Sequence, residues 1–151
     1  MNRIIAATAI AVGLSSGPAH AVCTLADIGG TWGFYADIYT GVQASPLALS
    51  CTLHIDKTSG QVATDSECES AGGGNSQSHG NVTFGEFSLT EPANCTFFFR
   101  FGTNTLRNSS IEVRRSTLSE NKQVLAGMIA SPPRSLTGAG SIVTMIKIRS
   151  E

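Results

Sequence analysis

Apolar and polar residues alternate with a period of two through most of the chain from Gly30 onward. Successive side chains of a β-strand point to opposite faces, so this alternation is typical of strands that bury one face. No segment shows the 3.6-residue apolar period of a long amphipathic helix. Short stretches rich in Gly, Asn, Ser and Pro interrupt the alternation, as β-turns do. The pattern therefore predicts an all-β protein.

Eight strands are predicted from these alternating segments. In the fourth, the apolar phase slips by one residue between Phe84 and Phe87, and Gly85 lies at the slip, which predicts a β-bulge there. The longest predicted connections are the Gly- and Ser-rich segments 40–46, 69–80, 102–109 and 131–140. The predicted strands are 31–39, 47–56, 61–68, 81–90, 95–101, 111–115, 123–130 and 141–149.

Short turns join the eight strands in sequence and leave no room for a crossover helix. A meander of this kind has no bare edge strand if it closes on itself. We therefore predict an eight-stranded antiparallel up-and-down barrel, with a two-sheet β-sandwich as the alternative. Such a barrel either fills its interior with side chains or holds one small ligand. The four long connections leave from the same end, which predicts one open mouth.

Residues 1–21 have the features of a bacterial signal peptide. Arg3 precedes an apolar run at 4–14, and Ala19-His20-Ala21 is a small-x-small cleavage site. The apolar run is too short to span a bilayer. We expect residues 22–151 to form a single domain that is exported to the periplasm or secreted and is not held in a membrane.

All four cysteines lie in this expected domain. An even number of cysteines in an oxidising compartment predicts two disulfides, for which three connectivities are possible. If Ile55 faces Val62 across their tight turn, Cys51 and Cys68 share a face one diagonal step apart. This placement favours Cys51–Cys68 and, by elimination, Cys23–Cys95. The chain has no C-x-x-C pair, so no metal site is expected.

The net charge of −1 hides an uneven distribution. Residues 22–99 hold one base, Lys57, and eight acids, whereas residues 100–151 hold eight bases and three acids. Neighbouring acidic and basic strands would neutralise one another; the alternative is a dipolar surface that steers a charged partner. Arg114 and Arg115 do not belong to a basic stripe with interleaved aromatic residues, so nucleic-acid binding is not expected.

Gly30-Thr31-Trp32 on the first predicted strand resembles the G-x-W motif of the lipocalin, or calycin, superfamily of eight-stranded barrels. The resemblance implies structural roles for Gly30 and Trp32, with Trp32 closing one end of the barrel under a basic residue. Arg149 is the first candidate for that residue and Arg134 the second. Avidin-like barrels and small bacterial inhibitors of secreted metalloproteases are the most similar members. In those inhibitors a disulfide joins the second and third strands, as Cys51–Cys68 would here.

No catalytic constellation is recognisable in the expected domain, and His54 is expected on the outer face. We therefore expect a binding protein without a cofactor rather than an enzyme. A small apolar ligand could bind at the open end of the barrel, unless the rings that would line its site simply fill the core. These candidate ligand-binding residues are Trp32, Phe34, Phe97, Phe99 and Phe101.

The alternative function is a protein-binding module, such as a protease inhibitor, that acts through its loops or its N-terminus. Phe98, Val124 and Met128 are expected on the outer surface. An apolar patch at these positions would suit a secreted protein partner or a homo-oligomer.

Overall fold

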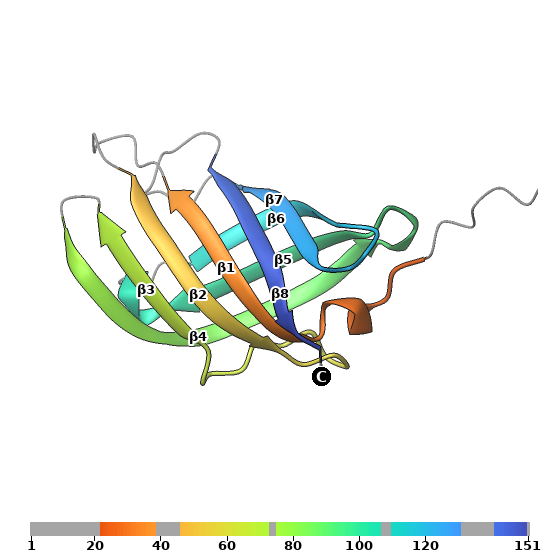
Figure 1. Ribbon diagram of the computed structural model, residues 1–151, viewed down its shortest axis with the longest axis horizontal. Helices are drawn as coiled ribbons and strands as arrows, with labels where there is room; N and C mark the ends of the chain where they lie inside the picture. The colour runs from red at the N-terminus through yellow and green to blue at the C-terminus, as the bar shows by residue number, and fades with distance from the viewer. Residues whose placement is uncertain (1–21, 39–45, 73–74, 107–109, 131–140, 151) are drawn as a thin grey trace, which may run out of the picture.

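Eight antiparallel strands follow one another around a closed barrel, in which the last strand pairs with the first (Figure 1). The computed structural model describes residues 22–38, 46–72, 75–106, 110–130 and 141–150. The predicted up-and-down barrel is confirmed, and the sandwich does not form. The strands are β1 (Gly30–Ile38), β2 (Leu47–Ile55), β3 (Glu67–Gly72), β4 (Asn75–Glu91), β5 (Thr96–Thr103), β6 (Ser110–Leu118), β7 (Val124–Ile129) and β8 (Ile142–Arg149).

Three short 3₁₀ helices accompany the strands. The helix η1 (Leu25–Ile28) precedes β1 and lies at one end of the barrel, drawn in orange in Figure 1. The helix η2 (Pro92–Asn94) turns the chain between β4 and β5, and η3 (Asn104–Leu106) follows β5. None of the helices in the described residues is long and apolar enough to cross a membrane. The predicted signal peptide lies outside the described residues.

Strict alternation in β1 gives the clearest agreement between sequence and structure. Trp32, Phe34, Ala36 and Ile38 are all buried, whereas Tyr35 is exposed. Strands β5 and β8 follow the same rule, because each turns every second side chain into the barrel. The core is therefore the interior of the barrel, as the period-two pattern requires.

The predicted third strand and the loop after it are wrong. Residues 61 and 62 form only isolated bridges, and a turn follows in which the Ser66 amide donates to the Ala63 carbonyl at 3.1 Å. Strand β3 begins at Glu67, and residues 69–72 and 75–80 are extended strands of a hairpin. Small polar residues have low strand propensity, but here β3 pairs with both β2 and β4, and residues 75–80 of β4 pair with β3.

This turn brings the second disulfide pair face to face. Ile55 does pair with Val62, as predicted, but the turn shifts the register by two residues before β3 begins. Cys51 and Cys68 are therefore direct partners instead of diagonal neighbours, with their Cα atoms 4.1 Å apart. Both predicted disulfides, Cys51–Cys68 and Cys23–Cys95, are formed.

The bulge predicted in β4 exists, but it comes earlier than Gly85. The register shifts between Val82 and Phe84, so Phe84 points outward and Gly85 points inward. The outward Phe84 ring lies against Gly102 on β5, where a side chain would collide with it. Phe84 thus belongs to the surface, although its apolar character placed it in the predicted core.

Candidate functional site

The five aromatic residues predicted to bind a ligand all lie inside the barrel and are fully buried. The ring of Phe34 meets Phe101 edge-on, with centroids 4.9 Å apart, and meets Phe99 at 6.3 Å. Phe87, which was not among the predicted residues, stacks on Phe99 at 4.6 Å. These rings contact one another in the geometries that aromatic cores prefer.

Leu53, Val113 and Met145 complete this interior and are likewise inaccessible to solvent. Protein interiors are packed as densely as organic crystals, so a ligand among these rings would have to displace core side chains. The predicted ligand-binding role of the aromatic residues stays a prediction. Their observed contacts are those of a packed core.

Trp32 closes one end of the barrel beneath η1. Its indole Nε1 donates a hydrogen bond of 2.7 Å to the carbonyl of Ile28, and both residues are fully buried. Gly30 at the start of β1 has φ +116°, and a Cβ there would lie 2.4 Å from the Arg149 carbonyl oxygen. Only glycine adopts such a conformation readily and permits this close approach, which explains the glycine of the Gly30-Thr31-Trp32 motif.

The cation over Trp32 is Lys147 and not Arg149. An irregularity between Thr31 and Trp32 makes Lys147 the direct partner of Trp32 and leaves Arg149 opposite Thr31. The Lys147 ammonium lies 5.2 Å from the centroid of the indole, within cation–π range, whereas Arg149 is exposed. The second candidate, Arg134, lies outside the described residues. In the period-two pattern, Lys147 and Arg149 share one face of the last strand. The pattern does not show which of the two is level with Trp32.

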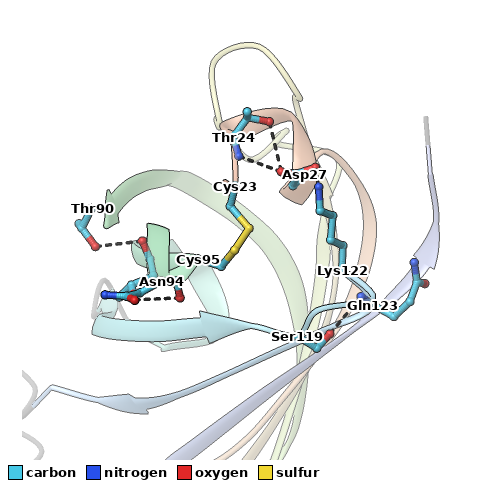
Figure 2. The surroundings of a disulfide bond; sticks show 10 residues. Cys23, Thr24, Asp27, Thr90, Asn94, Cys95, Ser119, Lys122 and Gln123 are labelled. Carbon is cyan, nitrogen blue, oxygen red and sulfur yellow. Dashed lines mark hydrogen bonds and ion pairs between the residues drawn. A yellow bond between two sulfur atoms is a disulfide. The ribbon is translucent and has the colours of Figure 1, made fainter. Parts of the chain in front are cut away.

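A small ionic cluster covers the same end. Lys122 reaches from the turn between β6 and β7 to Asp27, where its Nζ lies 2.6 Å from Oδ1 (Figure 2). Burial acts to raise the pKa of Asp27, but hydrogen bonds from Lys122 and from the Thr24 amide outweigh it and hold the pKa below its usual value. Lys147 donates to the Asp27 carbonyl at 3.0 Å, and burial lowers its pKa.

The N-terminal segment is fastened to this closed end. Figure 2 shows the disulfide that joins Cys23 to Cys95, and the Cys23 amide also donates to the Pro92 carbonyl at 3.0 Å. The Thr24 amide and hydroxyl donate to the Asp27 carboxylate and so cap η1. Because these groups bind one another, the closed end has a structural role.

A groove of about 500 Å³ crosses the outer face of the barrel from β1 to β4, with β8 along one edge. Ala48, Ser50 and Ala71 form its floor, and Tyr35 and Asp37 stand beside them on β1. The surface is hollow here because the side chains on the floor are small, whereas the side chains at the margins are longer. We call this hollow the outer groove.

A second hollow of about 510 Å³ continues the outer groove over β3 and β4, since Ser50 and Glu69 line both. Glu67 and His79 line it too, and His79 Nδ1 lies 3.1 Å from the Glu69 carboxylate. Asp37 and Glu67 have no ion pair with any described residue. The outer groove and the hollow that continues it are thus acidic.

Two acids on β4 are neutralised by bases from the second half of the chain. Glu86 pairs with Arg100 at 2.7 Å, and Glu91 pairs with Arg115 at 3.5 Å. The expected neutralisation between neighbouring strands therefore holds for β4 but not for the outer face of β1 to β3. The sequence reasoning missed this groove because it assigned 69–80 to a loop. The alternation of Glu67 and Glu69 with buried residues was the available signal.

His54 and Ser66 make hydrogen bonds within the barrel wall. His54 lies on the outer face, as expected, and is half-buried there, with its Nδ1 3.2 Å from the Thr31 hydroxyl. The Ser66 hydroxyl accepts a hydrogen bond from the His54 amide at 2.9 Å. In the part of the chain that the structure describes, no three His, Cys, Asp or Glu side chains are grouped so that they could hold a metal ion.

Comparisons with protein-family models, with curated proteins and with solved structures found no match to the chain. The closed eight-stranded barrel agrees with the lipocalin resemblance of Gly30-Thr31-Trp32 at the level of the fold. The two disulfides are typical of proteins in oxidising compartments outside the cytoplasm.

Proposed function

We propose that this protein is an exported, non-enzymatic protein-binding module, and that the outer groove is its recognition surface. The observation that carries the proposal is the contrast between the two sides of the barrel wall. Inside, the aromatic side chains are fully buried against one another; outside, a groove of about 500 Å³ runs across the strands. Ligand sites are concave, and the concavity here faces outward.

The chemistry of the outer groove suits a basic segment of another protein. Glu69 in the groove and Glu67 in the hollow that continues it supply negative charge that no arginine or lysine of the described residues pairs with. Complementary charge raises the association rate and selects among partners. Small floor side chains leave room for the backbone of an extended chain. An extended segment that carries Lys or Arg fits both features.

The small-ligand function predicted from the sequence has less support from the geometry. Its site would require space among aromatic rings that are fully buried and have no surface exposed to solvent. Protease inhibition by an inserted N-terminus is also disfavoured, because Cys23 is buried and bonded only one residue after the predicted start of the mature chain. Binding in the outer groove requires neither displacement of the core rings nor release of the N-terminal segment.

Site-specific photocrosslinking in the protein's own host tests the proposal. A photoreactive residue replaces Ala71 on the floor of the outer groove, and a matched variant carries it at exposed Ser88 on β4. We expect a discrete protein adduct from position 71 that weakens in the double variant Glu67→Gln/Glu69→Gln. Adducts of equal yield from both positions, or none from position 71, would argue against the outer groove as a binding site.

A further inference from the structure

A second surface on the outside of the barrel is apolar and belongs to neither the core nor the floor of the groove. Ile142 is 67% exposed, Ile148 64% and Met128 59%, which is unusual for side chains of this size. We call this surface the outer apolar face. Its members are Tyr35, Val124, Met128, Ile142, Ile146 and Ile148.

Strand pairing makes these side chains one continuous patch. Val124 is the direct partner of Ile146, and Met128 is the direct partner of Ile142. The Tyr35 ring lies over Gly33, close to Ile148, because Gly33 has no side chain to hold it away. On the outer face, the uncharged Ala126 and Thr144 lie between these pairs, and Lys147 of β8 points inward over Trp32. The patch predicted from Phe98, Val124 and Met128 was thus partly misplaced: Phe98 is half-buried on β5, with β6 between it and β7.

The outer apolar face is at the upper end of the range of apolar patches on monomeric proteins. Its six side chains expose on the order of 600 Å², while the largest apolar patch of a monomer is about 300–600 Å². A specific interface needs about 800 Å² on each partner, and homodimer interfaces are the more apolar ones. The outer apolar face would supply most of that area, and polar residues at its rim would have to supply the rest.

We propose that the outer apolar face binds a second copy of this chain, with the two barrels related by a two-fold axis parallel to their strands. The flanking charges select this arrangement. Arg115 on β6 is the direct partner of Met128, and Asp37 on β1 borders the same hollow as Ile142 on the opposite side. A cross-strand row therefore runs from a cation, through two apolar side chains, to an anion.

A two-fold axis along the strands reverses the order of the strands in the facing copy. It places Arg115 of one copy opposite Asp37 of the other, and does so twice. An axis across the strands would instead bring like charges together. Asp37 has no ion pair with the described residues, whereas Arg115 would exchange its 3.5 Å ion pair with Glu91 for this contact.

Molecular mass in solution tests this proposal. Light scattering behind gel filtration is measured across a concentration series for the disulfide-bonded protein, for Ile146→Lys and for Ser88→Lys. Ser88 is exposed on β4, which lies four strands away from β8 around the barrel. We expect the unmodified protein and Ser88→Lys to dimerise. We expect Ile146→Lys to raise the dimer Kd by about a hundredfold, because it places an unpaired charge in the apolar centre.

A charge exchange tests the orientation. Arg115→Asp should weaken the dimer, and adding Asp37→Arg should restore it, since the two charges then meet again with opposite signs. Native folding of each variant is checked by Trp32 emission. A protein that is monomeric throughout, or equal effects of Ile146→Lys and Ser88→Lys, would overturn the interface. Failure of the exchange to restore the dimer would overturn the proposed axis.

Discussion

At the scale of single residues, Trp32 connects the N-terminal helix to the barrel. Its ring fills the end of the core, its Nε1 satisfies the Ile28 carbonyl, and Lys147 lies over its face. The motif Gly30-Thr31-Trp32 pointed to this role and to a covering cation. The identity of that cation depends on an irregular register between β1 and β8, which the alternation of residues does not encode.

Replacing Trp32 should lower the free energy of unfolding for two reasons that two substitutions can separate. Trp32→Phe keeps a ring but deprives the buried Ile28 carbonyl of its donor, for an expected loss of about 1–3 kcal/mol. Trp32→Ala also leaves a cavity and should cost about 3–5 kcal/mol. Urea unfolding followed by circular dichroism measures both. As a control, Phe84→Leu at an exposed ring should change stability by at most about 0.5 kcal/mol. A loss as large as that of the Trp32 variants would contradict the special role assigned to Trp32.

Asp27 should make stability depend on pH in the acid range. Its folded-state pKa lies below 3.8, so its contribution is complete above about pH 3.8 and is lost as the pH falls through the lower folded value. Asp27→Asn should cost about 1 kcal/mol at pH 7, since partly exposed Lys122 is screened by solvent. The difference from the unmodified protein should vanish in acid.

Unfolding measured at neutral pH and in acid checks this expectation. Asp65→Asn, at an exposed carboxylate in the turn before β3, serves as the matched control and should show no such convergence. A difference between Asp27→Asn and the unmodified protein that persists unchanged in acid would contradict the ion pair.

At the scale of elements, sequence patterns predicted strands well where alternation was strict and poorly where small residues diluted it. Strand β1 was predicted to within a residue or two at each end because large apolar side chains mark its inner face. The β3–β4 hairpin was missed because Gly and Ser between 69 and 80 are typical of loops. The turn at residues 63–66 shifts the register, and only the paired strands reveal it.

The two disulfides hold different elements and should differ in their contribution. Cys51–Cys68 closes a loop of 17 residues between adjacent strands, whereas Cys23–Cys95 closes one of 72 and fastens the N-terminal segment. Loop entropy predicts losses of about 3 kcal/mol and about 4 kcal/mol when each pair is replaced by alanine. Chemical denaturation of the two double variants measures this order. A smaller loss for Cys23→Ala/Cys95→Ala would contradict it.

At the scale of the whole molecule, the closed barrel could be predicted from the number and order of alternating segments. The outer groove and the outer apolar face could not, because each is assembled from strands whose relative register the sequence leaves open. Ser50 and Glu69, for example, are neighbours only because β2 and β3 pair after the turn. Both candidate binding surfaces therefore appear only in the folded barrel.

The interior of the barrel is a filled core, and we propose that binding takes place outside it. An engineered cavity in a protein core can bind benzene. Phe99→Ala would open such a cavity among the rings of Phe34 and Phe87. The resonance of the Trp32 indole N–H, which belongs to the only tryptophan of the chain, reports on this interior.

The deciding measurement is an NMR titration of this resonance with benzene in the unmodified protein and in Phe99→Ala. We predict no saturable shift in the unmodified protein and a saturable shift in the variant, where the missing ring leaves space. Saturable binding by the unmodified protein that is weakened by Phe99→Ala would contradict a filled core. It would establish the barrel interior as a ligand site.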